Sequence, residues 1–402
     1  MPLHPPKIGA VITTYNRRDL LGPTLQSVLY QDGADSSVIV VVDDGSTDGT
    51  VEYLLDEFPA DIAHVDDRIA ETSLEGSPHG MVRVIRQQNQ HIAVAHNTGI
   101  RELLRLECPY LTHLDAEDLA FPNKHCVLAA YLDAHPGVGL VHAQSQDMSF
   151  DGFLFSEGSG PFEQVYRRAR PEGAFWERAA RGGFHAGDLA QGNYVHNQTT
   201  MYTRRAVTAA GEGNWFSEGM RYGSDWTFYQ RLERAGVPFG FVPAYVAFTR
   251  AHTGGISGTR SKGLTLDQAL VQAASSEERM EKADAYQWAR AKWPAEFEEA
   301  LQRTGTDTDF AALAGALQAS LRQLVDAGDL VDALNVAHRM QRLAPTPSGR
   351  RLIRDLVDAI VAQLAHGEPS LPLAKQLFAL QPSPRHAAAL ARLLADDAAA
   401  VR

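Results

Sequence analysis

The sequence has few cysteines and no excess of basic residues. Two of its 402 residues are cysteine, Cys108 and Cys126. They are too few for a disulfide-stabilised scaffold, and their spacing matches no metal-binding or redox motif. The formal net charge is −12, whereas nucleic acids and anionic lipid surfaces both attract basic proteins. We therefore expect no nucleic acid among the partners.

Long hydrophobic runs are also missing. No apolar stretch approaches the ~18 residues that cross a bilayer, so we expect no transmembrane segment. The N-terminal residues Met1–Lys7 lack the apolar core of a signal peptide. Hydrophobic residues make up 44% of the chain and charged residues 21%, as in soluble folded proteins. Together these features predict a cytoplasmic protein, free or peripheral to a membrane.

The first part of the chain alternates short apolar runs with amphipathic stretches. Polar turn residues follow the apolar runs, as is typical of parallel strands covered on both faces. The predicted strands are Ile8–Thr13, Val38–Val42, Val82–Ile85 and Tyr110–Leu114, and the predicted helices are Leu20–Leu29 and about Ala93–Leu106. This order predicts an α/β fold built from βαβ units. We expect Asp61–Gly80 to be an inserted surface loop.

The composition changes after about Leu264, where alanine, leucine and charged residues dominate. We therefore predict two domains, 1–262 and 263–402, the second all-helical. Ala337 and Ala374 occupy equivalent places in a degenerate repeat that resembles tetratricopeptide repeats, although two independent amphipathic helices fit equally. Such helices could join copies of the chain into a homo-oligomer, dock a large acceptor or buttress the first domain, and we favour the homo-oligomer.

Polar residues follow the first two predicted strands. Thr13, Tyr15 and Arg17 follow the first strand, and Asp43 and Asp44 follow the second. The carboxyl ends of adjacent parallel strands are where open α/β sheets bind ligands. A simple helix-capping turn is the alternative. A dinucleotide-binding fold is disfavoured because no G-x-G-x-x-G motif follows either strand.

The fourth predicted strand ends in an acidic turn containing Asp115, Glu117 and Asp118. Three carboxylates so close together repel one another unless a cation or strong donors lie among them. Oxygen ligands of this kind suit Mg²⁺ or Mn²⁺ and, through the metal, a diphosphate. A solvated acidic turn is the alternative.

Further polar residues come later in the chain. Glu218 precedes a predicted helix that begins near Asp225 and Trp226. An aspartate at a helix start is often only a cap. Arg250 lies two residues before His252, and an arginine at this place suits a phosphate partner.

In order, spacing and type, these segments resemble the family 2 nucleotide-sugar glycosyltransferases with the GT-A fold. The resemblance runs from Ile8 to about Ser257 and includes Thr-x-Tyr-Asn, Asp-Asp-Gly-Ser-Thr-Asp-Gly-Thr and Asn97-Thr-Gly-Ile. An Asp-x-Asp-Asp motif is represented by the acidic turn. The resemblance implies a Rossmann-like, mostly parallel sheet with helices on both faces. It also implies inverting, metal-dependent transfer of a sugar from a nucleotide diphosphate to an unidentified acceptor, whether polysaccharide, glycoconjugate, peptide or small molecule.

The resemblance also assigns roles to individual residues. The nucleoside would be bound by Thr13, Tyr15 and Asp44, with Asp115 near the ribose or the sugar. Mn²⁺ or Mg²⁺ would be held by Glu117, Asp118 and His252. Asp225 would be the catalytic base, and Arg250, Trp226 and Glu218 would lie on the diphosphate and acceptor side.

Several positions depart from the family pattern. Ser224 stands where the family has the glutamate of a Glu-Asp pair, and Glu117 replaces an aspartate. His91 and His96 stand where the family often has glycine and arginine. Two other functions stay open: a helical adaptor with an inactive transferase domain, favoured by Ser224, and a nucleotidyltransferase. The second would need a glycine-rich basic loop after the first strand, and Thr13–Arg18 is not one.

Overall fold

A computed structural model of the protein describes residues 8–32, 37–59, 62–66, 82–149, 152, 154, 189, 193–211, 213–220, 223–251, 270, 286, 297–304, 310–343, 346–366 and 370–400. The chain divides into two compact units. The sheet unit comprises Met1–Asp147, Phe155–Arg250 and Gln381–Arg402, and the helical unit comprises Met148–Leu154 and Ala251–Leu380. The boundary predicted between 262 and 263 lies outside the described residues and stays a prediction.

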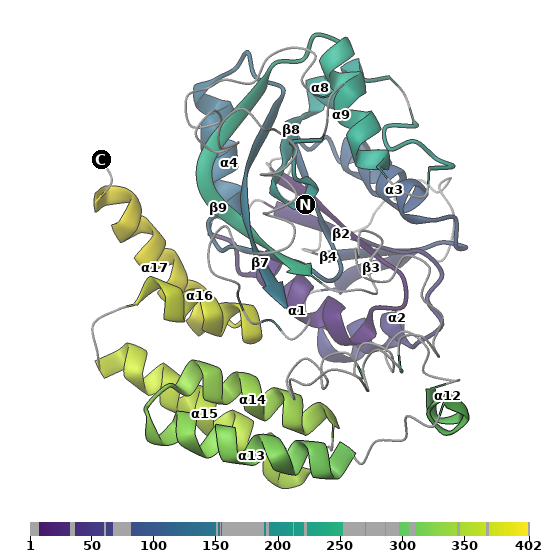
Figure 1. The fold of residues 1–402 in the computed structure, drawn as a ribbon. Coiled ribbons are helices and arrows are strands. Elements are labelled where there is room, and N and C mark those ends of the chain that lie inside the picture. The colour runs from purple at the N-terminus through teal and green to yellow at the C-terminus, as the bar shows by residue number, and fades with distance from the viewer. Residues whose placement is uncertain are drawn as a thin grey trace. The chain divides into compact units, whose positions relative to one another are not determined.

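One sheet organises the sheet unit, with the strand order β3-β4-β2-β1-β5-β8-β7-β9-β6 (Figure 1). Strands β3, β4, β2, β1 and β5 pair in parallel, while β8 runs antiparallel to β5 and β7, and β6 runs antiparallel to β9. The strands are β1 Ile8–Thr14, β2 Ser37–Asp43, β3 Ile62–Asp66, β4 Val82–Arg86, β5 Tyr110–Asp115, β6 Leu119–Ala120, β7 Leu140–Ser149, β8 Met201–Thr203 and β9 Phe239–Ala251. The α/β prediction is confirmed, but the sheet is mixed because its second half is antiparallel.

Helices cover both faces of the parallel half. Successive residues of a strand point to opposite faces. Ile12 accordingly packs in a cluster with residues of α1 (Arg18–Leu29) and α2 (Thr50–Glu57). Its neighbour Val11 packs in a second cluster with residues of α3 (Ile92–Arg105). This double burial explains why β1 and β2 are apolar almost throughout. The remaining helices of the first 250 residues, as far as they are described, are α4 Lys124–Ala134, α8 Arg204–Ala209 and α9 Ser224–Arg234.

The strands and helices predicted from the sequence are confirmed within two residues at each end. The prediction of a surface loop over Asp61–Gly80 is wrong for Ile62–Asp66, which forms β3 and pairs in parallel with β4. This strand lies at the end of the sheet. An edge strand pairs on one side only and needs no continuous apolar run, so its sequence gives a weak signal. Residues 67–81 lie outside the described part of the chain.

The helical unit contains α12 Phe297–Thr304, α13 Phe310–Asp326, α14 Leu330–Leu343, α15 Pro347–His366 and α16 Leu371–Leu380. Consecutive helices pack from α13 to α16. The small residues Ala337 and Ala374 of the proposed repeat are both buried, as helix crossings require. The last helix, α17 (Pro384–Ala400), belongs to the sheet unit. Self-association through the C-terminal helices stays a prediction.

None of the helices that the structure describes combines the length and apolarity needed to cross a membrane.

Two helical glycines test the packing of α3 on β1. A Cβ on Gly99 would lie 2.4 Å from Cγ1 of Val11, whereas a Cβ on Gly315 in α13 would meet nothing within 4 Å. Gly99→Ala should lower the free energy of unfolding by about 1–3 kcal/mol through overpacking. Gly315→Ala should raise it by about 0.5–1 kcal/mol, because alanine favours the helix. Urea titrations followed by circular dichroism compare the free energies of unfolding of the two variants. An unchanged free energy of unfolding for Gly99→Ala would contradict the close packing of α3 on β1.

Candidate functional site

The site begins where three neighbouring strands end. Strand β1 lies between β2 and β5, and the pairing sets Thr14 beside Asp43 and Thr13 beside Asp115. The polar ends of these strands therefore meet at one edge of the sheet. This is the edge at which open α/β sheets bind ligands.

Hydrogen bonds fix the two loops after β1 and β2 to each other. The backbone N–H of Asn16 donates to Oγ of Ser46 at 2.9 Å, and the N–H of Thr47 donates to Oδ1 of Asn16 at 2.8 Å. Gly45, in the loop after β2, has a φ of 82°, and a Cβ on this residue would lie 2.9 Å from the backbone nitrogen of Asn89. Glycine is therefore required at this turn.

Asp44 is buried and held in one orientation. Its Oδ1 accepts from Nε2 of Gln87 at 2.7 Å and from the backbone N–H of Gln90 at 3.0 Å. Gln87 is itself fixed, because its Oε1 accepts from the hydroxyl of Thr98. Tyr15 is 46% exposed. A fixed carboxylate and an accessible aromatic ring are groups that can hydrogen-bond and stack with a nucleobase.

Asp115 is bracketed by polar side chains. Its Oδ2 accepts from Nε2 of Gln198 at 2.7 Å, while the Asp115 backbone N–H donates to Oε1 of the same glutamine. Its Oδ1 lies 3.4 Å from both Oγ1 of Thr13 and Nε2 of His96. One quarter of the Asp115 side chain is still exposed. The carboxylate is oriented by the protein yet accessible to a ligand.

The acidic turn is tied to β9 through Arg250. The backbone N–H of Arg250 donates to Oδ1 of buried Asp118 at 2.7 Å, and its Nε donates to the Glu117 carbonyl at 2.7 Å. Burial raises the pKa of Asp118 well above its usual value, and the charges of Asp115 and Glu117 raise it further. Burial also lowers the pKa of Arg250 to about 10. Both shifts have burial as their largest cause, so the charged forms of Asp118 and Arg250 are disfavoured by the loss of water.

The carboxylates of the acidic turn suit a divalent cation whose remaining coordination positions are filled by the substrate. Within the described ranges no group of three histidine, cysteine or acidic side chains surrounds a common point, and His252 lies outside those ranges. Asp115 and Glu117 are 25% and 21% exposed and belong to one turn. Mg²⁺ is commonly bound by one or two carboxylates, with phosphates and water filling the remaining positions. These two residues fit a site of that kind.

Asp225 lies in the first turn of α9, as expected from the sequence. Its Oδ2 accepts from Nδ2 of Asn193 at 3.2 Å. Burial raises the pKa of Asp225, the charge of Asp115 raises it further, and His96 lowers it. The charge of Asp115 therefore acts on Asp225, although the two residues lie on different elements.

The other residues expected on the diphosphate and acceptor side are held by neighbouring loops. Nε1 of Trp226 donates to the carbonyl of Leu189 at 2.7 Å. Glu218 is exposed, and its Oε1 accepts from Nδ2 of buried Asn97 at 3.0 Å. Asn97 also exchanges two hydrogen bonds with the backbone of Phe216. Helix α3 thus fixes the loop that precedes α9.

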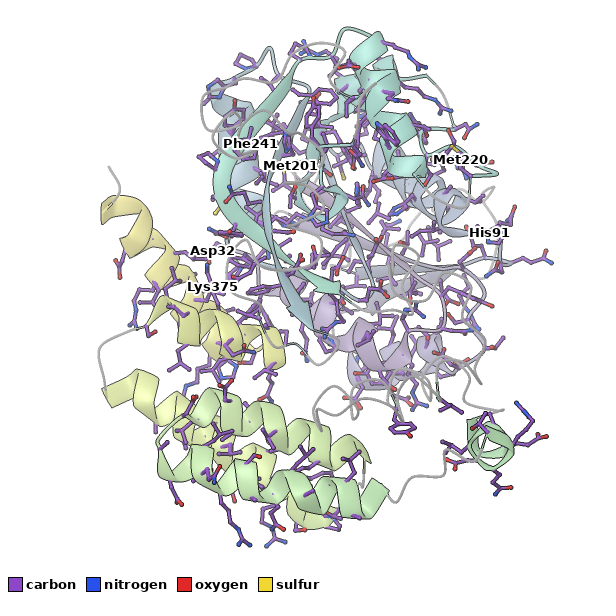
Figure 2. The ribbon with its side chains drawn as sticks, in the orientation of Figure 1. Asp32, His91, Met201, Met220, Phe241 and Lys375 are labelled. Atoms are coloured by element: carbon purple, nitrogen blue, oxygen red, sulfur yellow. The ribbon has the colours of Figure 1, made fainter. Side chains whose placement is uncertain are left out.

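The two histidines that depart from the family pattern have distinct environments. His91 lies at the surface before α3 (Figure 2), with a φ of 73° that favours glycine. His96 is buried and stacks on Phe216 with ring centroids 4.4 Å apart. His96 therefore lies against Asp115, at the position where the family often has arginine.

A polar network around His113, two residues before Asp115, was not predicted from the sequence. His113 bonds to the hydroxyl of Tyr202 and to Oδ1 of Asn197, and burial lowers its pKa well below the usual value. Tyr229 from α9 also donates to Asn197. Asn197 comes from a stretch that has neither periodicity nor a known motif. That stretch therefore gives no signal from which these contacts could be predicted.

Comparison with known proteins finds a family model that matches the N-terminal part of the chain. Residues 10–179 match the family model described as Glycosyl transferase family 2, which confirms the resemblance for this part of the chain. A Rickettsia felis protein described as an uncharacterized glycosyltransferase is 25% identical over 223 residues, or 56% of this chain. The chain spans only 29% of that relative's length.

Two solved structures align with most of the chain, at low sequence identity. S. aureus TarS 1–349 in complex with UDP is 13% identical over 96% of this chain and 91% of that chain, with a TM-score of 0.43. The mannosyltransferase PcManGT from Pyrobaculum calidifontis, in complex with GDP-Man and Mn²⁺, is 17% identical over 98% and 89%, with a TM-score of 0.42.

The buried amine of Lys124 gives a prediction for stability. Its Nζ donates to the His113 carbonyl at 3.0 Å, and burial lowers its pKa from 10.5 to about 7, against the charges of Asp118 and Asp115. Between these two values the unfolded chain binds a proton that the folded chain does not, so this lysine makes stability rise with pH. Lys124→Met should reduce that rise by up to about 1.4 kcal/mol per pH unit. Urea unfolding of the wild type and of Lys124→Met, at several pH values between the two pKa values, measures the free energy of unfolding against pH. Equal slopes for the two proteins would contradict the depressed pKa of Lys124.

Proposed function

We propose, with residues 10–179 as a glycosyl transferase family 2 domain, that the protein transfers a sugar from a nucleotide diphosphate to an acceptor hydroxyl. The observation that carries the proposal is the meeting of Asp44, Asp115 and the acidic turn at the carboxyl ends of β1, β2 and β5. These groups offer base, ribose and diphosphate contacts along one edge. The acceptor is a polysaccharide, glycoconjugate, peptide or small molecule.

The donor nucleoside lies across the ends of β1 and β2. Asp44 accepts a hydrogen bond from the base through the carboxylate that Gln87 and Gln90 orient. Tyr15 stacks on the base with its exposed ring, and Thr13 lies beside the ribose with Asp115. The side chains of Asp44 and Asp115 are held by hydrogen bonds before the donor binds, so less conformational entropy is lost on binding.

Mn²⁺ or Mg²⁺ is held at the acidic turn by Glu117, with Asp115 as the second accessible carboxylate. When bound, the cation supplies positive charge that stabilises the departing nucleoside diphosphate. The sequence resemblance gives Asp118 as a further ligand, but its side chain is buried. We therefore assign Asp118 to supporting the turn, through the hydrogen bond that it accepts from the backbone N–H of Arg250. His252, two residues after Arg250 in the sequence, stays a candidate ligand.

The transfer is a single displacement with inversion. The acceptor oxygen forms a bond to the anomeric carbon, the bond from that carbon to the diphosphate oxygen breaks, and the nucleoside diphosphate leaves. The acceptor proton passes to the carboxylate of Asp225. Partial burial raises the proton affinity of this carboxylate, which strengthens it as a base. Glu218 and Trp226 line the acceptor side.

Asp225→Asn tests the base. Asparagine keeps the shape and one side-chain oxygen in the first turn of α9, so donor affinity should persist while kcat falls by about two to four orders of magnitude. Because the base must be ionised, the wild-type kcat should fall with decreasing pH through a pKa above the usual 3.8. Both the kcat of the variant and the pH dependence of the wild-type kcat are measured as nucleoside diphosphate release from a panel of nucleotide sugars, with cell extract as the source of acceptor. Asp332→Asn, in the first turn of α14, is the matched control, and near-normal transfer by folded Asp225→Asn would refute the assignment.

Glu117→Ala tests the cation. EDTA should abolish turnover by the wild type, and added Mn²⁺ should restore it. Glu117→Ala should need at least about tenfold more Mn²⁺, because one of two accessible carboxylates is lost. Its thermal midpoint should change little, since the side chain is partly exposed. Full wild-type activity in the presence of chelator would reject a role for the cation.

A further inference from the structure

Glu117 has a cationic partner from another loop. Nε of Arg17 lies 2.9 Å from Oε2 of Glu117, and Nη1 of the same guanidinium donates to the Asn16 carbonyl at 3.1 Å. Arg17 is the residue that precedes α1. An arginine from the end of β1 therefore neutralises the carboxylate that we assign to the divalent cation.

Three cationic side chains of the described residues act on the acidic turn, and they differ in burial. Lys124 and Arg250 are 1% and 7% exposed, whereas the Arg17 side chain is 32% exposed. Moving either buried cation would disrupt packing and the hydrogen bonds to the His113 and Glu117 carbonyls. Arg17 can leave without such a loss, because a partly exposed ion pair is weak.

We propose that Arg17 is a displaceable cation, which holds Glu117 in the absence of donor and gives way when a divalent cation binds there. The inference rests on the proposed function, since it takes Glu117 as a ligand. A divalent cation and a guanidinium repel each other at one carboxylate. The two therefore compete for Glu117.

The donor offers the released guanidinium a new partner. A divalent cation reaches this turn together with two phosphate groups, and a guanidinium binds phosphate oxygens through paired N–H donors. Arg17 also precedes the first turn of α1, where the helix dipole favours anions. Arg17 thus exchanges one anionic partner for another. It positions Glu117 before binding and the diphosphate afterwards.

The exchange predicts that removing Arg17 tightens the binding of the cation alone. Mn²⁺ is titrated into the full chain without nucleotide, and unbound Mn²⁺ is measured by electron paramagnetic resonance. Arg17→Gln should bind Mn²⁺ about two- to fivefold more tightly than the wild type, the range expected when a partly exposed ion pair is lost. Arg18→Gln is the matched control, because it removes the same charge one residue away, where the guanidinium lies over the ring of Tyr53. It should bind Mn²⁺ as the wild type does.

A second titration tests the other half of the exchange. With Mn²⁺ saturating, pyrophosphate should bind Arg17→Gln about fivefold or more weakly than Arg18→Gln, since a charged hydrogen-bond pair is missing. Unchanged pyrophosphate affinity would overturn the transfer of Arg17 to phosphate.

The outcomes of the Mn²⁺ titration separate this inference from the proposed function. Equal or weaker Mn²⁺ binding by Arg17→Gln, in a protein whose wild type binds Mn²⁺, overturns the exchange and leaves the cation site intact. No Mn²⁺ binding by the wild type or either variant overturns both the site and the exchange. Circular dichroism and thermal midpoints of the three proteins confirm that each is folded.

Discussion

The parallel register of β1 with β2 and β5 is the constraint on which the site depends. Because side chains alternate along a strand, a slip of one residue would turn Thr13 away from Asp115 and move Val11 and Ile12 to the wrong clusters. Burial on both faces makes such a slip costly, since each of these apolar side chains contributes about 1.5–3 kcal/mol when buried. The core therefore fixes the spacing between the nucleoside residues and the acidic turn. Stability and ligand geometry are set by the same pairing.

The acidic turn, in contrast to the apolar core, destabilises the folded state. Asp118 is buried with a raised pKa, and neighbouring carboxylates raise it further, so ionising this turn in the folded state costs free energy. Arg250 offsets part of the cost by bonding both the Asp118 carboxylate and the Glu117 carbonyl. Arg17, from the loop between β1 and α1, pairs with Glu117 at the exposed end of the turn. A ligand that brings positive charge relieves the remaining repulsion, so cation binding and donor binding are expected to reinforce each other.

The fold was predictable where local pattern and tertiary role agree. Runs such as Val38–Val42 are apolar because both faces are covered, and they appear as strands at nearly the predicted ends. Polar strands such as β7, with buried Ser145 and Asp147, have no such pattern and were not predicted. Asp115 and Asp225 were found because motifs mark them. Their partners Gln198 and Asn193 were not, because contacts over 83 and 32 residues of sequence leave no local trace.

Asp115 and Asp225 show how the surroundings can make two aspartates differ. Oδ2 of Asp115 accepts from Gln198, and its Oδ1 accepts from Thr13 and lies 3.4 Å from Nε2 of His96. These contacts hold the Asp115 carboxylate in one orientation, in which it can position a ligand. Asp225 accepts from Asn193, and burial together with the charge of Asp115 raises its pKa. Enzymes that need a base separate it from its neighbours by such differences in environment. Asp115 therefore also raises the proton affinity of Asp225, which couples the donor side of the site to the residue that would deprotonate the acceptor.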